Sequence, residues 1–178
     1  MALELRMSDI LEGPGMRGTL SRSDLLRGRL RDTPPVLRPP WASPEDEFSA
    51  RCDRCLHCAE ACPEGIIVAG ARGLPEVDFQ RGQCSFCKEC IQACSVGLLV
   101  DRGQAPWATA AKISFSCLSV QGVLCRLCEE RCEPVAIRFR PALGGYALPE
   151  VDSEACNGCG ACVGVCPVGA VEIRKKPS

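Results

Sequence analysis

Residues 52–63 read Cys52-Asp53-Arg54-Cys55-Leu56-His57-Cys58-Ala59-Glu60-Ala61-Cys62-Pro63, with cysteines spaced C-x2-C-x2-C-x3-C. The same spacing recurs in two further groups, and a fourth group differs only in a first gap of seven residues. The regular groups are Cys52, Cys55, Cys58 and Cys62; Cys84, Cys87, Cys90 and Cys94; and Cys156, Cys159, Cys162 and Cys166. The stretched group is Cys117, Cys125, Cys128 and Cys132. Together they use all sixteen cysteines of the 178-residue chain.

This spacing suits cubic iron–sulfur clusters. A 4Fe–4S cluster takes four thiolates, and three cysteines at every third residue can wrap a loop around one cluster. The fourth cysteine, three residues later, is expected in a short helix that points it away from that cluster. In the bacterial ferredoxin arrangement it binds the second cluster of a pair. The sequence therefore predicts four 4Fe–4S clusters, built in pairs.

Two other cysteine chemistries explain the pattern less well. A structural zinc site uses four ligands, commonly from two C-x2-C pairs, and gives a third cysteine at the same spacing no role. Disulfide scaffolds belong to secreted proteins and give no reason for this repeat. Metal thiolate chemistry is therefore favoured over both.

The linkers between the groups contain a second repeat. After the first group, residues 65–68 and 74–78 flank a glycine turn, and after the third group residues 135–139 and 148–152 do the same. Both linkers carry Leu-Pro-Glu-Val-Asp, and both predict a β-hairpin. The second linker lacks this pentapeptide and ends in an expected strand at 112–116. The repeat favours pairing of adjacent groups over pairing of the two outer and the two inner groups.

These patterns predict an α+β protein with two tandem bacterial 2x(4Fe–4S) ferredoxin-like modules, at residues 46–105 and 106–178, after a cysteine-free N-terminal arm at 1–45. Each expected cluster takes three cysteines from one group and the fourth from its neighbour. The ligands are Cys52, Cys55, Cys58 and Cys94 for cluster 1; Cys84, Cys87, Cys90 and Cys62 for cluster 2; Cys117, Cys125, Cys128 and Cys166 for cluster 3; and Cys156, Cys159, Cys162 and Cys132 for cluster 4.

Composition excludes several functions. Lys and Arg number 21 against 22 Asp and Glu, so the broadly basic surface of many nucleic-acid binders is not expected. No apolar run is long enough for a membrane-spanning helix. No nucleotide-binding G-x4-G-K-[ST] loop occurs, and we expect no enzyme with a substrate of its own. Only 4% of residues are aromatic, so the clusters must contribute to the stability of modules this small.

The N-terminal arm is rich in arginine and proline. Residues 23–31 could form a short helix, and prolines stiffen the chain before Trp41. The arm could pack across the first module or bind a partner. Residues 21–27 resemble a twin-arginine export signal, but a serine replaces one arginine and no apolar region follows. We therefore expect a cytoplasmic protein.

The chain as a whole resembles the NapF-type ferredoxin-like proteins of the periplasmic nitrate reductase system. The resemblance rests on the Ser-Arg-x-x-Leu-Leu-Arg-Gly-Arg arm, on Arg38-Pro39-Pro40-Trp41 and on the four cysteine groups. It implies a cytoplasmic accessory protein that acts on the nitrate reductase catalytic subunit before export and helps to install its 4Fe–4S cluster. The alternative is a ferredoxin-type electron carrier or redox subunit.

The stretched third group suggests where a cluster could leave. Residues 118–124 separate Cys117 from Cys125, and a longer loop is expected to hold its first ligand less rigidly. Cluster 3 is therefore the candidate for a labile cluster, although the insertion could also merely reshape the surface beside an ordinary one.

Overall fold

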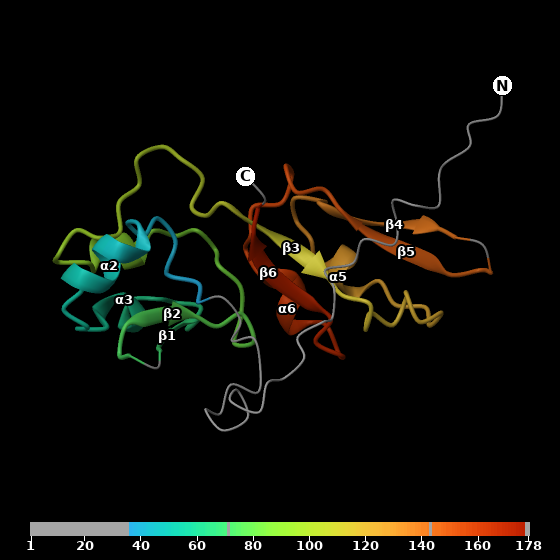
Figure 1. Cartoon of the computed structure of the whole chain (residues 1–178), viewed down its shortest axis with the longest axis horizontal. Helices are drawn as coiled ribbons and strands as arrows, with labels where there is room; N and C mark the ends of the chain where they lie inside the picture. Colours follow the sequence, from blue (N-terminus) through green and yellow to red (C-terminus); the bar gives the residue numbers. More distant parts are fainter. Residues whose placement is uncertain (1–35, 71, 143, 177–178) are drawn as a thin grey trace, which may run out of the picture. The chain divides into compact units, whose positions relative to one another are not determined.

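The computed structural model describes residues 36–176 except 71 and 143 (Figure 1). The helix expected at 23–31 and most of the arginine-rich arm lie outside these residues. In the described part, the elements are four helices of one turn, one longer helix and six strands in three two-stranded antiparallel sheets. None of the described helices has the length and apolar character needed to cross a membrane.

Both hairpins expected from the linker repeat are present. Strand β1 (Ile67–Ala69) pairs with β2 (Pro75–Val77), with Ile67 opposite Val77. Strand β4 (Ile137–Pro141) pairs with β5 (Ala147–Val151), with Ile137 opposite Val151. The repeated Leu-Pro-Glu-Val thus supplies the second strand of each hairpin.

The third sheet joins the two ends of the second module. Strand β3 (Thr109–Ile113) pairs with β6 (Val171–Lys175), so the strand expected at 112–116 begins three residues earlier. After Ile113 the chain turns, with the Cys117 N–H donating to the Ser114 carbonyl, and delivers Cys117 to its site. In the first module a single bridge between Ala42 and Leu99 takes the corresponding place.

Each cysteine group forms one turn of helix. These turns are α3 (His57–Glu60), α4 (Glu89–Gln92), α5 (Leu127–Glu130) and α6 (Ala161–Gly164). Each contains the third cysteine of its group, buried, and ends before the fourth. The expectation that the fourth cysteine lies inside the helix is therefore corrected. A single turn is not stable alone, so its conformation depends on packing and on the cluster that the cysteines bind.

Left-handed backbone recurs three residues after every fourth cysteine. The φ angles there are +62° at Gly65, +66° at Gly97, +53° at Val135 and +61° at Gly169. At each position the N–H donates to the carbonyl of the fourth cysteine and closes a tight turn. Glycine adopts this conformation freely, whereas the β-branched Val135 is strained. The shared turn shows that the four groups are copies of one local structure.

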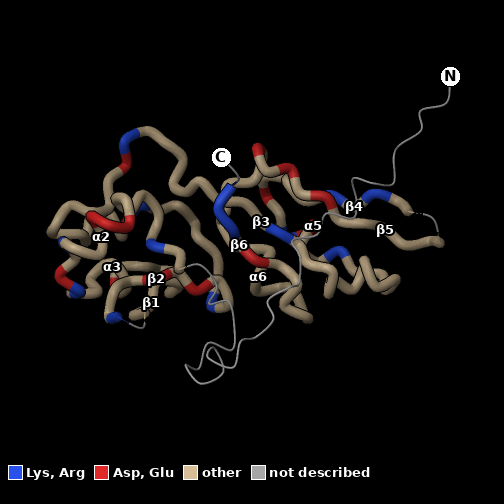
Figure 2. Tube along the Cα trace, viewed as in Figure 1, with Lys and Arg blue, Asp and Glu red and all other residues tan. Residues whose placement is uncertain are grey.

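Residues 36–51 pack against the first module, where the Val77 N–H donates to the Leu37 carbonyl, and also contact the start of the second module. The indole Nε1 of Trp107 donates to the Arg38 carbonyl at 3.0 Å, and the Trp41 N–H donates to the Pro106 carbonyl at 2.9 Å. Helix α2 (Glu45–Arg51) follows, with acidic residues in its first turn that suit the helix dipole (Figure 2). Its Phe48 is buried. Arg38, Pro39 and Trp41 therefore have a structural role, because they pack this segment against the part of the chain that carries the cysteine groups.

The core consists of medium-sized apolar residues and cysteines. Phe48, Ile66, Leu74, Leu98 and Ile137 are the larger apolar side chains that are almost completely buried. The third cysteine of every group, Cys58, Cys90, Cys128 or Cys162, belongs to the same buried cluster. The metal-binding residues are thus built into the core, as the shortage of aromatic residues led us to expect.

Candidate iron–sulfur centres

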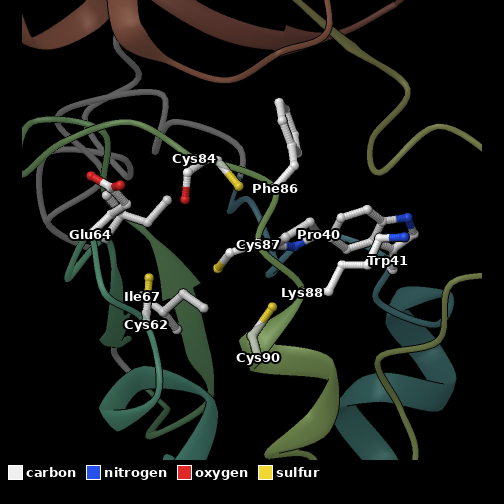
Figure 3. A pocket seen from close by; sticks show the side chains of 12 residues that line it. Pro40, Trp41, Cys62, Glu64, Ile67, Cys84, Phe86, Cys87, Lys88 and Cys90 are labelled. Carbon is white, nitrogen blue, oxygen red and sulfur yellow. The ribbon is translucent and has the colours of Figure 1, made fainter.

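The cysteines expected to bind cluster 2 surround one small cavity. Cys62, Cys84, Cys87 and Cys90 line it, and their sulfur atoms face the same space (Figure 3). Cys62 comes from the first group and the other three from the second. The aromatic residues Trp41 and Phe86 and the stem of Lys88 complete the wall. The fold therefore brings together the quartet that adjacent pairing predicts.

A second cavity contains the quartet expected for cluster 3. Cys117, Cys125, Cys128 and Cys166 line it, together with Leu127, Phe139 and Val168 among others. Cys117 reaches this cavity although seven residues separate it from Cys125. The stretched group is therefore equivalent to the compact ones in three dimensions.

For the other two quartets, the pKa shifts of two thiols have contributions from both cysteine groups of a module. The charges that raise the pKa of Cys58, after burial, are those of Cys94, Cys55 and Cys52. The charges that raise the pKa of Cys159, after burial, include those of Cys156 and Cys132. The two cavities each combine cysteines of adjacent groups, which is the first of the two pairings that the sequence left open.

Burial makes these thiols hard to ionise on their own. It raises the pKa of Cys58, Cys84 and Cys128 to about 11 and that of Cys90 and Cys162 to about 12. A smaller contribution comes from neighbouring cysteines, including Cys58 near Cys90 and Cys128 near Cys162. Four thiolates crowded into a buried space need a cation to offset their charge. The sites therefore suit a positively charged metal centre.

Backbone N–H groups point at several of the sulfur atoms. In three groups the backbone N–H four residues after the fourth cysteine donates to the sulfur of that cysteine. The nitrogen–sulfur distances are 3.4 Å from Leu98 to Cys94, 3.2 Å from Ala136 to Cys132 and 3.1 Å from Ala170 to Cys166. The Ala111 N–H lies 3.5 Å from the sulfur of Cys156. Such bonds stabilise sulfur-centred negative charge and raise the reduction potential of iron–sulfur clusters.

The arrangement of the cysteines fits a cluster better than a single ion. No three His, Cys, Asp or Glu side chains in the described segments are arranged to hold one metal ion. The sulfur atoms of the cluster 2 quartet instead surround a space (Figure 3). All sixteen cysteines lie among the described residues and are free thiols. A set of four thiols around one space fits a 4Fe–4S cube, which presents one iron to each sulfur.

The stretched loop is more ordered than expected from its length. Backbone bonds run from Gln121 to Cys117 and from Val123 to Leu118, and the hydroxyl of the buried Ser119 donates to the Ala147 carbonyl. Cys117 itself is only 7% exposed. The expectation of a loosely held first ligand is therefore corrected: the inserted residues form a closed turn with an internal anchor.

Apolar side chains are exposed around the cluster 3 quartet. Leu124 is 81% exposed and Phe115 73%, and Leu127 and Val168 on the cavity wall are also exposed. Val123, beside Leu124, completes the set. We call Phe115, Val123, Leu124, Leu127 and Val168 the apolar patch. Exposed apolar groups that lie so near the ligands, on the cavity wall or along the chain, suit a surface that binds another protein.

Two pairs of four-cysteine sites on hairpin and one-turn-helix modules define a tandem dicluster ferredoxin. Residues 51–98 and 123–170 each match the 4Fe-4S dicluster domain family, and the chain therefore has sites for four 4Fe–4S clusters. The second match begins after Cys117, so the structure is what places this cysteine beside the other three.

Relatives specify the family further. The chain is 45% identical to the ferredoxin-type protein NapF of Haemophilus influenzae, over 89% of this chain and 90% of that protein. It is 44% identical to NapF of Escherichia coli K12, over 88% and 95%. The methylamine utilization ferredoxin-type protein MauM of Methylophilus methylotrophus is 32% identical, over 80% and 71%. The chain belongs to the NapF family of ferredoxin-type proteins.

The cysteine spacing did not predict which other residues enclose the cluster 2 site. Lys88 places its Nζ 5.9 Å from the centre of the Trp41 ring and 2.7 Å from the Asp101 carboxylate. This ion pair holds the pKa of Asp101 below its usual value. The Arg-Pro-Pro-Trp element was the available signal, but its position beside a cluster follows only from tertiary contacts.

Proposed function

We propose that this protein is a cytoplasmic iron–sulfur accessory protein for maturation of the periplasmic nitrate reductase catalytic subunit. It acts before export, assists insertion of the subunit's 4Fe–4S cluster and has no substrate turnover of its own. In this proposal its two tandem α+β modules bind clusters 1 to 4 through the four quartets given above. The resemblance to NapF-type proteins of the periplasmic nitrate reductase system supports this choice of partner.

The observation that carries the proposal is the apolar patch around the Cys117, Cys125, Cys128 and Cys166 quartet. A protein that hands over a cluster must bring that site against the receiving protein, and such a contact needs an accessible surface beside the ligands. The patch supplies one: Leu124 directly precedes a ligand, and Leu127 and Val168 line the cavity itself. Burial of these side chains would favour association. Cluster 3 is therefore the proposed donor.

A specific contact favours the second candidate function, electron transfer. The Cys84 N–H donates a 2.8 Å hydrogen bond to the Cys159 carbonyl, so an expected cluster 2 ligand contacts an expected cluster 4 ligand across the modules. An electron carrier with several centres needs such proximity, whereas a cluster donor does not.

The two functions separate in a transfer experiment. Anaerobically reconstituted protein carrying radioactive iron and sulfide is mixed with the cluster-free catalytic subunit, which is then isolated and counted. Maturation predicts that both labels move together. If the subunit only exchanges electrons with this protein and acquires no label, the donor role is wrong and the carrier role is favoured.

The apolar patch is tested by Leu124→Ser, with Leu148→Ser as the matched control. Leu148 is 41% exposed and belongs to β5, whereas Leu124 directly precedes the ligand Cys125. Leu124→Ser should slow label transfer and weaken binding while all four clusters remain, and Leu148→Ser should do neither. Equal effects of the two substitutions would remove the special role of the patch.

The cytoplasmic location needs its own experiment. The full chain is fused to a reporter enzyme that is active only in the periplasm, and the product is examined for cleavage. We expect an inactive, unprocessed fusion. An active and shortened product would contradict the proposed site of action.

A further inference from the structure

Phe79 of the first module packs against the cluster 4 loop of the second. It follows strand β2 and is only 7% exposed. Its ring covers Gly160, which lies between Cys159 and Cys162: a Cβ at Gly160 would lie 2.0 Å from the ring carbon Cδ1. The Phe79 carbonyl oxygen lies 3.3 Å from the corresponding position at Gly164, the end of α6. Gly160 therefore lies where Phe79 leaves no room for a side chain, and Gly164 lies where Phe79 leaves little.

The contact continues along the backbone of both ligand loops. The Cys84 N–H donates to the Cys159 carbonyl at 2.8 Å. Cys159 directly precedes Gly160, so this hydrogen bond and the Phe79 ring hold two consecutive residues of the same loop. The loop also carries left-handed φ angles, +74° at Gly158 and +80° at Gly160. Contacts with Phe79 and Cys84 of the first module therefore fix the shape of this loop at the point where the loop would enclose cluster 4.

Phe79 stands at one end of a row of four aromatic rings. The ring centres of Phe79 and Trp107 are 5.8 Å apart. Those of Trp107 and Phe86 are 6.0 Å apart, and those of Phe86 and Trp41 are 6.3 Å apart. All three pairs pack edge-to-face. Phe86 sits between Cys84 and Cys87 in the cluster 2 loop. The chain has only two Trp, one Tyr and five Phe, and half of these eight residues form this row. Edge-to-face pairs stabilise their packing beyond the area that they bury.

We infer that Phe79 is a positioning residue for the cluster 4 site, so that the first module completes a metal site of the second. The ring holds Gly160 and the hydrogen bond holds Cys159, which keeps the ligands Cys159 and Cys162 at the spacing that the cluster needs. This role goes beyond the proposed function, because neither cluster donation nor electron carriage requires one module to shape a site in the other. Residues that orient ligands commonly change metal affinity when they are replaced.

The test follows iron release from the full-length, anaerobically reconstituted protein to a chromogenic chelator. In Phe79→Ala we expect four of the bound irons to leave in a separate phase, about tenfold faster than in the parent, which is in the range found for residues behind metal ligands. Phe79→Leu keeps apolar volume without the ring and should lie between the two. Leu148→Ala, which removes an exposed apolar side chain of β5, is the control and should match the parent.

A second pair of variants approaches the contact from the other side. Gly160→Ala would place a methyl group into the Phe79 ring, whereas Gly169→Ala has φ +61° and no neighbour within 4 Å. Both carry the strain of a left-handed alanine, but only the first disturbs Phe79. We expect the same fast four-iron phase in Gly160→Ala and its absence in Gly169→Ala. Redox titration followed by electron paramagnetic resonance should show one altered potential in Phe79→Ala.

Two results would overturn the inference. One is release and redox curves of Phe79→Ala and Phe79→Leu that superimpose on those of the parent. The other is uniform acceleration of all iron release in both variants, because it would mean that Phe79 stabilises the fold as a whole and no particular cluster. A loss of folding in Phe79→Ala leaves Phe79→Leu to decide between these outcomes.

Discussion

Arg38 and Glu45 form a two-pronged ion pair that fastens the start of the described chain to the first module. Arg38 Nε donates to Glu45 Oε2 at 2.9 Å and its NH2 donates to Oε1 at 2.7 Å. The same guanidinium donates to the Pro75 carbonyl at 3.2 Å and lies 5.6 Å from the centre of the Phe48 ring. Arg38 therefore joins α2 to β2 through one side chain that is only 12% exposed.

Replacing Arg38 by lysine should destabilise the protein although the charge is kept. An ammonium group cannot reproduce the planar fork toward Glu45 while it also reaches Pro75. We expect a loss of about 1–2 kcal/mol, reduced from the value for a buried charged hydrogen bond because Glu45 is partly exposed. The measurement is thermal unfolding of the cluster-loaded protein. Arg138→Lys on the exposed part of β4 is the control, and equal midpoints for the two variants would contradict the prediction.

Glu45 should make this contact dependent on pH. The hydrogen bond from Arg38 holds the pKa of Glu45 below its usual 4.5. A carboxyl group whose pKa is lowered by folding stabilises the folded protein. This stabilisation is fully present above pH 4.5 and is lost as the pH falls through the lowered pKa. The difference in unfolding midpoint between the parent and Glu45→Gln should therefore be larger at pH 7 than at pH 4. A difference that stays constant over this interval would exclude the carboxylate as its source.

Cys117 should be a cluster ligand although it lies outside the matched domain at 123–170. Each 4Fe–4S cluster contains four irons, so the parent should hold about sixteen irons and sixteen sulfides. Cys117→Ala should lose about four of each, because one cluster would have only three thiolates. The neighbouring exposed Ser116→Ala should retain the parent content. Full iron and sulfide content in Cys117→Ala would show that another group completes the site.

Val135 occupies a position where the other three copies have glycine. Its φ of +53° is unfavourable for a β-branched residue, and its side chain is 54% exposed, so little packing would be lost on truncation. Val135→Gly should stabilise the protein by up to about 1 kcal/mol, since the relief of left-handed strain exceeds the entropy cost of glycine.

The reciprocal substitution is Gly169→Val, at the same turn with no neighbour within 4 Å of its Cβ position. It should destabilise by a similar amount, measured as a shift of the unfolding midpoint in the opposite direction. If Val135→Gly lowers the midpoint, the valine makes a compensating contact in the cluster-loaded protein.

Local chemistry accounts for what the sequence by itself determined. The cysteine spacings predict 4Fe–4S sites because a loop with a thiol at every third residue can reach three corners of a cube, wherever it occurs. The Leu-Pro-Glu-Val repeats predict both hairpins because a strand and its turn are encoded within about a dozen residues. The same repeat predicts that adjacent cysteine groups pair. These features need only neighbours in the chain or one partner motif.

Tertiary structure alone decided the contacts between motifs. Nothing in the sequence of residues 78–80 indicates that Phe79 covers Gly160, or that Cys84 hydrogen-bonds to Cys159, because both depend on how two finished modules pack. The closed turn around Ser119 and the burial of Cys117 were unpredictable for the same reason: a loop length does not reveal an anchor on a distant strand. Ligand identity is a property of spacing, whereas the rigidity and enclosure of each site come from side chains that only the packed fold brings to it.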